Sequence, residues 1–354
     1  MRVAIYIEPW IQQKAGISVF TEHLVRSCSQ SKHQFITIGS KKLDLPFEHI
    51  HMPPWKSSFF NPSRYFGVSK LNLCKYNIEV LIDTGHYATI GLFIVNRKFV
   101  VVHDITPTLH PKFHRIKSRL GHKLLLKRAL SEADKIITIS DQTMSDVSEH
   151  YGFDSKLNRI YPGMRSFEKN DASKSTLHIS KPYFLCVGTI EPRKNHAKLI
   201  QAFDLFCQVN RDYDLIIVGD RGWKVDLDQL ISQSSNKDQI KRWGYVSATD
   251  LRQLYTHAAS CVYVSLYEGF GFPVLEAMSM GCPVITSKVG SMNEIAKGAA
   301  KLVNPYSPEE ISIAMYDLVT IEGERTRLIN LGLERSAKFT WTDYIRQLDE
   351  LLED

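Results

Sequence analysis

Short apolar runs alternate with amphipathic segments along the first half of the chain. Runs of this kind predict strands at Val3–Ile7, Phe35–Ile38, Val80–Ile82, Phe99–Val102 and Lys135–Ile139. Apolar residues at helical spacing predict a helix from about Ser18 to Cys28. Short apolar strands separated by helices are typical of a parallel sheet that helices cover on both faces.

A second alternating series follows a polar interruption. The sequence has no apolar run between Gly163 and Lys181, which indicates a linker. Beyond the linker, further strands are predicted at Tyr183–Val187, Leu215–Val218, Cys261–Val264 and Val284–Thr286, each followed by a helix-like segment. With 354 residues, the chain is longer than a typical single core. We predict an α/β fold of two Rossmann-like doubly wound domains, residues 1–168 and 169–338, facing each other across a cleft.

The amino-acid composition indicates a globular protein but does not indicate a particular function. A hydrophobic content of 44% with 23% charged residues is ordinary for a soluble globular enzyme. The six cysteines form no C-x-x-C pair and several lie in strand-like runs, so we expect reduced thiols in a cytosolic protein. We expect no signal peptide, because a strand is predicted directly at Arg2–Ile7, and no apolar run is long enough to cross a bilayer. We therefore expect a cytoplasmic location.

Positive charge gathers in one segment. The stretch from Ile105 to Ser131 has no acidic residue and these cations: Lys112, Arg115, Lys117, Arg119, Lys123, Lys127 and Arg128. Phe113, Ile116, Leu120 and Leu124 fall at helical spacing, which predicts a basic amphipathic helix. Such a helix either lies on anionic lipid through the region Lys112–Arg128, or is solvated and packs by its apolar stripe.

A second segment favours the lipid alternative. His51–Gly67 is rich in aromatic residues and proline, and Trp55, Phe59 and Phe60 are unexpected in a loop unless something apolar docks there. Together, the two segments favour contact with a membrane or a lipid-linked acceptor. Nucleic acid is a poorer candidate, because no recognised nucleic-acid-binding module accompanies the charge.

The stretch Val264–Cys282 is the most informative about chemistry. After a strand, a loop carries Glu268 and glycines, and Pro273 then opens a helix that is predicted to hold Glu276 in its first turn. Free N–H groups at a helix start bind phosphate oxygens. The two carboxylates repel phosphate but suit the hydroxyls of a ribose and of a second sugar, so the segment favours a nucleotide sugar. The alternative is a plain connection in which the helix dipole favours Glu276.

These residues resemble a known family. The motif EGFGFPVLE resembles the E-x7-E signature of retaining glycosyltransferases of family 4, which have the GT-B fold. Further segments match that family in order: MRVAIYIEPWIQQKAGIS, VVHDITPTLHP, ITIS and VGTIEPRKN. The resemblance implies an acceptor-binding N-terminal domain, a nucleotide-sugar-binding C-terminal domain, and a last helix, within residues 339–354, that crosses back to the N-terminal domain.

In the second domain, Arg193 and Lys194 follow a strand and precede a helix. Cations there stabilise the charge that develops on a leaving diphosphate. Lys194 lies where the family has its diphosphate-binding lysine, but Thr189 stands where many relatives carry an arginine. The planar guanidinium of Arg193 suits the missing role. The alternative, two surface cations at a helix start, is opposed by the helix dipole.

In the first domain, His103 and Asp104 end a buried strand. A lone histidine at a strand end is more often structural, but the resemblance implies an active-site histidine that contacts the donor sugar, and we expect Asp104 to orient its ring. Ser140 either touches the acceptor or caps the following helix, and we favour the cap.

The resemblance implies the remaining roles. Glu268 is expected to bind hydroxyls of the transferred sugar, and Glu276 the ribose diol. Other donor-binding residues implied are Gly16, Gly188, Thr189, Gly219, Asp220, Tyr245, Val246, Gly269, Phe270, Gly271 and Phe272. No metal and no cofactor are expected, because helix termini and cations neutralise the diphosphate.

The sequence thus predicts a metal-independent retaining hexosyltransferase, with GDP-mannose as the best donor and a UDP-hexose or UDP-N-acetylhexosamine as the alternative. The expected acceptor is a lipid-linked or growing bacterial surface glycan (O-antigen, capsule or exopolysaccharide), met at the inner face of the cytoplasmic membrane. A non-catalytic nucleotide-sugar-binding scaffold of a glycan-assembly complex stays open, because Thr189 departs from the family pattern.

Overall fold

The structure is a computed structural model. It describes residues 1–7, 16–40, 42–52, 71–85, 87, 90–114, 116–165 and 179–354, and within these ranges it gives the backbone only for 116–121. The aromatic segment with Trp55, Phe59 and Phe60, and most of the predicted linker, lie outside the described residues. The chain forms two compact units, Met1–Gly163 with Phe339–Asp354, and Met164–Lys338. The boundary between the two units falls between residues 163 and 164, whereas the sequence predicted it between residues 168 and 169.

The first unit is built on a seven-stranded sheet in which every neighbouring pair of strands is parallel. In spatial order its strands are β3 (Glu48–His51), β2 (Gln34–Gly39), β1 (Arg2–Tyr6), β5 (Val80–Asp83), β7 (Arg97–Val102), β8 (Lys135–Thr138) and β9 (Leu157–Arg159). A separate two-stranded sheet joins β4 (Leu71–Asn72) to β6 (Phe93–Ile94). The central strands are buried on both faces, as the apolar runs predicted.

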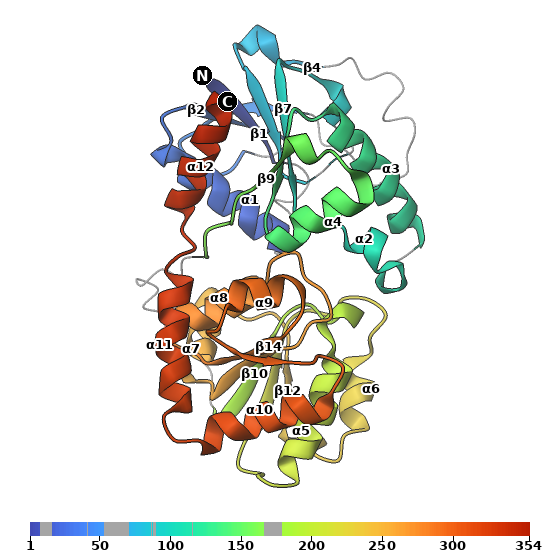
Figure 1. Ribbon diagram of the computed structural model, residues 1–354, viewed down its shortest axis with the longest axis vertical. Coiled ribbons are helices and arrows are strands. Elements are labelled where there is room, and N and C mark those ends of the chain that lie inside the picture. The colour runs from blue at the N-terminus through green and yellow to red at the C-terminus, as the bar shows by residue number, and fades with distance from the viewer. Residues whose placement is uncertain are drawn as a thin grey trace. The chain divides into compact units, whose positions relative to one another are not determined.

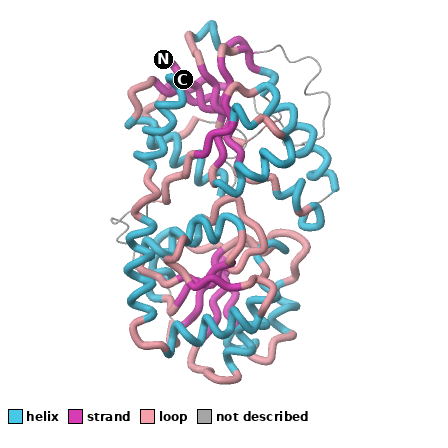
Figure 2. Tube along the Cα trace, in the orientation of Figure 1, coloured by secondary structure: helices cyan, strands magenta, loops and turns pink. Residues whose placement is uncertain are grey.

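Helices cover this sheet (Figures 1 and 2). They are α1 (Gly16–Ser27), α2 (Thr106–Leu109), α3 (Ile116–Glu132), α4 (Asp141–Tyr151) and α12 (Trp341–Glu353). Leu126 and Leu130 of α3 and Val147 of α4 pack against Val100 and Ile136 of the sheet. The amphipathic C-terminal helix predicted from the sequence is α12, and it belongs to this unit, where it packs on α1.

Polar contacts fix α12 in place as well. The Ser31 hydroxyl donates to the Asp349 carboxylate at 2.5 Å, and the Arg97 guanidinium donates to the Leu352 carbonyl oxygen at 2.7 Å. Cations near a helix C-terminus are stabilised by the exposed carbonyls there.

The second unit repeats the plan with a six-stranded parallel sheet. Its spatial order is β12 (Ile240–Trp243), β11 (Asp214–Val218), β10 (Tyr183–Val187), β13 (Ser260–Tyr263), β14 (Val284–Ser287) and β15 (Lys301–Val303). Its helices are α5 (His196–Cys207), α6 (Leu227–Ser232), α7 (Ala248–His257), α8 (Phe272–Ser279), α9 (Gly290–Ala296), α10 (Pro308–Thr320) and α11 (Glu324–Ser336). Helices α5 and α10 pack on each other over one apolar cluster.

The structure corrects two members of the predicted apolar stripe, while the side chains of Ile116 and Leu120 lie outside the described residues. Phe113 lies before α3, in a short 3-10 turn, and Leu124 is 67% exposed. Among the described side chains of α3, those of 122–132, the buried ones are Leu126, Ala129 and Leu130. Consecutive leucines at 124–126 fit more than one helical register, and packing on the sheet selects the one that turns Leu124 outward.

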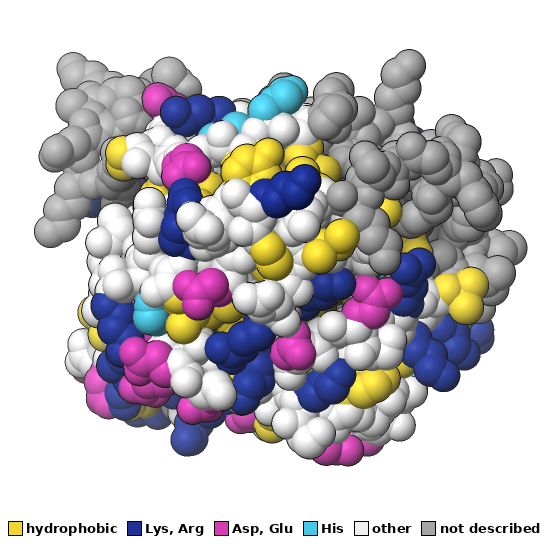
Figure 3. Space-filling view, turned by 90° about the horizontal axis from the view of Figure 1, so that it is seen from above, with side chains coloured by type: hydrophobic (Ala, Val, Ile, Leu, Met, Phe, Trp, Pro, Cys, Tyr) yellow, Lys and Arg dark blue, Asp and Glu magenta, His cyan; other side chains and the backbone are white. Residues whose placement is uncertain are grey.

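Charge on the surface is mixed where it can be seen. On the face drawn in Figure 3, Lys and Arg side chains lie among Asp and Glu side chains. In the described part of the chain, no helix has both the length and the hydropathy that crossing a membrane requires.

Candidate active site

Two loops leave the same edge of the second sheet. Strands β10 and β13 are parallel neighbours, so the segments that follow them begin side by side at the carboxyl edge. The Leu266 amide donates to the Arg193 carbonyl oxygen at 2.8 Å and ties the loops together. The Asn195 side chain donates to the carbonyl oxygens of Val264 (3.1 Å) and Pro305 (2.6 Å). This bracing fixes the backbone from which the charged side chains project.

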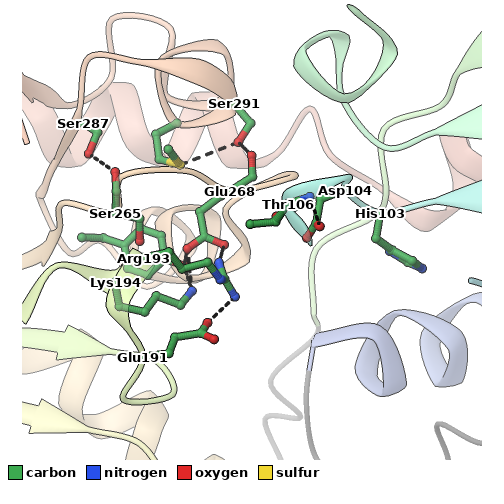
Figure 4. A network of polar contacts seen from close by, with 12 residues as sticks. His103, Asp104, Thr106, Glu191, Arg193, Lys194, Ser265, Glu268, Ser287 and Ser291 are labelled. Carbon is green, nitrogen blue, oxygen red and sulfur yellow. Dashed lines mark hydrogen bonds and ion pairs between the residues drawn. The ribbon is translucent and has the colours of Figure 1, made fainter. Parts of the chain in front are cut away.

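Four charged side chains meet there (Figure 4). One carboxylate oxygen of Glu268 lies 2.6 Å from the Lys194 ammonium, and the other pairs with the Arg193 guanidinium. Arg193 also reaches a carboxylate oxygen of Glu191 at 2.6 Å. The Tyr263 hydroxyl accepts from Lys194 and donates to Glu268 at 2.9 Å. The predicted cations are therefore neighbours of the predicted sugar-binding glutamate.

Burial and charge compete in setting the pKa values of this cluster. Burial alone would raise the pKa of Glu268, but Arg193 and Lys194 outweigh it and bring that pKa to about 2. Burial, with the nearby Arg193, lowers the pKa of Lys194, and Glu268 opposes that fall. Glu268 is thus a carboxylate at every physiological pH.

The loop that carries Glu268 is anchored through its backbone. The Ser291 hydroxyl donates to the Glu268 carbonyl oxygen at 2.7 Å, and the Ser287 hydroxyl donates to the Ser265 carbonyl oxygen at 2.6 Å. Both contacts appear in Figure 4. A carboxylate held on a braced loop is preorganised, which is what a binding group for a specific hydroxyl pattern needs.

Glycine is required at two of the predicted donor-binding positions. Gly219 has φ +148°, and a Cβ there would lie 2.0 Å from the Gly188 carbonyl oxygen. Gly188 has φ +154°, a backbone conformation that residues with a side chain rarely adopt. Gly219 therefore allows two stretches of backbone to lie close together, and Gly188 allows the turn after β10.

Glu276 lies on α8, in its second turn rather than the predicted first, because the helix begins at Phe272. Gly271 precedes the helix with φ +113°. The Glu276 carboxylate is buried and accepts a hydrogen bond from the Tyr255 hydroxyl at 3.1 Å. Burial raises its pKa, partly offset by Arg165 and Tyr255. Dipole stabilisation fades beyond the first turn, so the plain explanation for this carboxylate loses its support.

The other predicted donor residues fall into two groups. Thr189, Asp220 and Tyr245 are exposed in loops that follow β10, β11 and β12, and Val246 is half-buried. Gly269 and Phe270 are buried with Glu268, and Phe272 is half-buried at the start of α8. All of these residues follow carboxyl ends of strands in one sheet, the edge at which doubly wound folds bind ligands.

In the first unit, His103 follows β7 and is buried. Its Nε2 lies 2.9 Å from the Thr84 carbonyl oxygen, and its ring meets Phe20 edge-on at 4.7 Å between centroids. Burial lowers the pKa of His103 to about 4, against smaller opposing effects of Thr84 and Asp104. The ring is neutral, Nε2 carries the hydrogen that Thr84 accepts, and Nδ1 is left as an acceptor.

Asp104 does not orient that ring, which corrects the prediction. Its carboxylate accepts from the backbone amide of Thr106 at 2.9 Å (Figure 4). An aspartate just before a helix satisfies an amide at the helix start, and this local bond takes precedence over the imidazole. The carbonyl of Thr84 does the orienting instead.

Two further predictions concern the first unit. Gly16 is the first residue of α1, and its contact with the diphosphate stays a prediction. Ser140 accepts from the Thr143 amide at 3.0 Å as the N-cap of α4, so the cap that we favoured is confirmed.

Sequence reasoning missed three polar residues of these sites. Glu191 lies inside the motif VGTIEPRKN, two residues before Arg193. An acidic residue so close to a cation in sequence was a signal that could have identified it. Tyr263 and Tyr255 gave no such signal, because aromatic residues in strand and helix patterns are indistinguishable from core residues.

Comparison with known proteins adds the family. A model described as glycosyl transferases group 1 matches residues 168–335, and one described as glycosyltransferase family 4 matches residues 15–165. The O-antigen chain mannosyltransferase B of Escherichia coli is 32% identical over 72% of this chain and 69% of its own length. The chain belongs to glycosyltransferase family 4.

Further comparisons agree with this assignment. The O-antigen chain mannosyltransferase RfbU of Salmonella typhimurium is 31% identical over 66% of this glycosyltransferase and 63% of its own length. The crystal structure of HepE from Anabaena in complex with UDP-glucose has a TM-score of 0.74 and 16% identity, covering 100% of this chain and 99% of that one. At this identity the structural likeness shows the fold alone, which is GT-B.

Proposed function

We propose that this glycosyltransferase moves a hexose, with retention of configuration, from a nucleotide diphosphate donor to a growing bacterial surface glycan. The observation that carries the proposal is the cluster of Arg193, Lys194 and Glu268 on the same braced loops that lead to Glu276. Cations for a diphosphate and carboxylates for two sets of hydroxyls are the groups that a nucleotide sugar requires.

In the proposed reaction, Arg193 and Lys194 stabilise negative charge on the leaving diphosphate as the glycosidic C–O bond breaks. Glu268 accepts hydrogen bonds from hydroxyls of the transferred sugar, and Glu276 accepts from the ribose diol. The acceptor oxygen forms the new bond on the face from which the diphosphate leaves, and its proton passes to the leaving phosphate. Two cations hold Glu268, which makes it a poor nucleophile and supports a mechanism without a covalent enzyme intermediate.

We further propose that no metal takes part, because charged side chains and the amides at the start of α8 supply the neutralisation that a divalent ion gives elsewhere. Activity should therefore survive chelation. Loss of turnover in EDTA, with recovery on adding Mg²⁺ or Mn²⁺, would contradict this part of the proposal.

Mannose from GDP-mannose is the proposed donor. The names of the two bacterial relatives, both O-antigen mannosyltransferases, support it. The UDP-glucose complex of HepE supports the alternative of a UDP-sugar, on fold likeness only. A thermal-shift screen against GDP-, UDP-, ADP- and dTDP-sugars tests the proposal. GDP-mannose is expected to raise the melting temperature most. A greater rise with a UDP-sugar would favour the alternative donor. No rise with any of these nucleotide sugars would contradict donor binding.

A non-catalytic scaffold is the competing function, and the exposed Thr189 at the usual arginine position favours it. Slow hydrolysis of the donor without acceptor distinguishes the two, since a scaffold should show none. The intact pairing of Arg193 and Lys194 with Glu268 favours the enzyme.

We also propose that α3 meets an anionic membrane surface where a lipid-linked acceptor is available. Lys123 and Lys127, one helical turn apart, are exposed, as is Leu124, while Arg128 pairs with Glu132 at 2.8 Å. Each such cation near an anionic bilayer contributes about 1 kcal/mol, and the exposed leucine beside them can enter the interface.

Sedimentation with vesicles tests this surface. Lys123→Glu with Lys127→Glu should abolish binding to phosphatidylglycerol vesicles, and salt should weaken the binding of the unmodified chain. Lys237→Glu with Lys241→Glu, on the second unit, makes the same charge change as a control. Equal loss in both variants, or binding to neutral vesicles, would contradict a role for α3.

A further inference from the structure

The charged cluster of the second unit pairs its cations with carboxylates of the same unit. Its cations are Arg193 and Lys194, and its carboxylates are Glu191 and Glu268. Side-chain exposure is 2% for Glu191, 9% for Lys194 and Glu268, and 21% for Arg193. The groups expected to attract a diphosphate therefore already have anionic partners inside the protein.

This balance changes what a diphosphate must do in order to bind. If the diphosphate oxygens accept hydrogen bonds from the Arg193 guanidinium in place of Glu268, the Glu268 carboxylate loses one of its two cationic partners. A buried carboxylate that loses a partner without gaining another is costly. Binding of the diphosphate alone is thus opposed by Glu268, which competes for the same donors.

An intact nucleotide sugar removes that opposition. Its diphosphate oxygens accept from the cations, and its sugar hydroxyls donate to the Glu268 oxygen that Arg193 gives up. The nucleoside diphosphate left after transfer brings acceptors only. We propose that Glu268 is a resident competitor for the diphosphate cations, so that this unit holds the nucleotide sugar more tightly than the nucleoside diphosphate and expels the latter after transfer. The inference rests on the proposed function and adds product discrimination to it.

The geometry indicates which half of the cluster opens. Lys194 is the more deeply buried cation, and Tyr263 bridges it to Glu268 by accepting from one and donating to the other. Arg193 is the more exposed cation and keeps Glu191 as a partner when Glu268 leaves it. We assign the exchange to the contact between Arg193 and Glu268, with the contact between Lys194 and Glu268 retained.

Calorimetry on Glu268→Gln tests the inference. The amide keeps the shape but removes the competing charge, so GDP or UDP, whichever the unmodified chain binds, should bind at least about tenfold more tightly, the scale of one charge-assisted hydrogen bond. Turnover should fall in the same variant, and its preference for the intact donor over the nucleoside diphosphate should shrink. Glu322→Gln removes an equal charge from an exposed loop and should change neither. Unchanged or weaker nucleoside diphosphate binding in a folded Glu268→Gln would overturn the inference.

A second measurement needs no substitution. In the unmodified chain, the free hexose of the donor should tighten nucleoside diphosphate binding by several-fold, because its hydroxyls release Glu268 from Arg193, and the coupling should be reciprocal. The inference is wrong if hexose has no effect on that affinity. The proposed function fails differently: the unmodified chain would then bind neither nucleotide sugar nor nucleoside diphosphate.

Discussion

Each of the two units buries an ionisable group just after the carboxyl end of a strand, and the two groups differ in charge state. In the second unit, Glu268 is buried and ionised, because two cations outweigh the loss of solvent and hold its pKa at about 2. In the first unit, His103 is buried and neutral, because loss of solvent dominates and lowers its pKa to about 4. The same burial thus yields a charged site in one unit and an uncharged one in the other.

The difference lies in what surrounds each group. Glu268 is held by ion pairs and a phenol, contacts that an incoming anion or hydroxyl can replace. His103 is held by a backbone carbonyl and by the ring of Phe20. The Phe20 ring packs in turn on Trp341 and Tyr344, with ring centroids 5.5 Å and 5.8 Å from its own. The second unit is built for exchange of partners, and the first for a fixed orientation.

Removing a charge from the second unit should have the largest effect. Lys194→Met takes away the buried ammonium that we assign to the diphosphate, and turnover should fall by about 100- to 1000-fold, the scale for one preorganised charge stabiliser. Lys198→Met, in the first turn of α5, is the control and should leave turnover unchanged. Steady-state kinetics with the donor of the screen measures both. A loss of only a few-fold would mean that Lys194 serves the fold rather than the reaction.

The pH dependence of stability should separate His103 from Glu268. The pKa of His103 is lower in the folded chain, about 4, than its ordinary value of 6.5, so the unfolded chain binds the extra proton as the pH falls. Its contribution is intact above about pH 6.5 and is lost between pH 6.5 and 4, by up to about 3 kcal/mol. The pKa of Glu268 falls from 4.5 to about 2, so its contribution is intact above pH 4.5 and is lost only below that.

Urea unfolding from pH 7 to 3 checks these windows. His103→Phe, which keeps an aromatic ring against Phe20, should flatten the curve between pH 6.5 and 4 relative to the unmodified chain. Glu268→Gln should flatten it only below pH 4.5. His196, buried in the second unit with a pKa lowered by burial to about 4, supplies a control: His196→Phe should mimic His103→Phe in stability but not in turnover. Identical windows for the His103 and Glu268 variants would remove the contrast between these two groups.

Glu276 tests whether the second unit binds more than one set of hydroxyls. Glu276→Ala removes the acceptor that we assign to the ribose diol, and donor affinity should fall by about 1.5–3 kcal/mol, the value of a charge-assisted hydrogen bond. Tyr255→Phe, which removes only the hydroxyl that donates to Glu276, is the conservative comparison and should cost less. Calorimetry with donor settles the matter, and unchanged affinity in Glu276→Ala would contradict the assignment.

The sequence was sufficient for the interior of both sheets and insufficient at their edges. Every central strand was predicted, with ends displaced by a residue or two. The strands that were missed in the two large sheets are β3, β9, β12 and β15, which are the four edges. An edge strand is buried on one side only and tolerates polar residues, as in Glu48–His51, so the apolar run that marks a central strand is missing.

The sites divide in the same way. Arg193, Lys194 and Glu268 could be predicted as a diphosphate and sugar site because motif and charge mark them. Their mutual pairing could not, since it depends on how two loops separated by some 70 residues meet at one sheet edge. The error at Asp104 has a similar cause: adjacency in sequence suggests a partner for His103, whereas the Asp104 carboxylate accepts from the helix amide of Thr106, two residues on.

The smallest expected effects come from two matched helix caps, one in each unit. Ser140 accepts from the Thr143 amide and Ser247 from the Asp250 amide, both at 3.0 Å. Replacing either serine by alanine should cost about 1 kcal/mol of stability.

Ser140 is buried, and its hydroxyl donates to the Thr143 hydroxyl at 3.0 Å. The Thr143 hydroxyl donates in turn to the His103 carbonyl oxygen at 3.3 Å. Ser140→Ala should therefore cost more than Ser247→Ala, yet leave the KM for acceptor unchanged. A raised KM for acceptor at unchanged stability would instead make Ser140 an acceptor contact and give the first unit a polar site of its own, which would weaken the contrast between an exchanging unit and a fixed one.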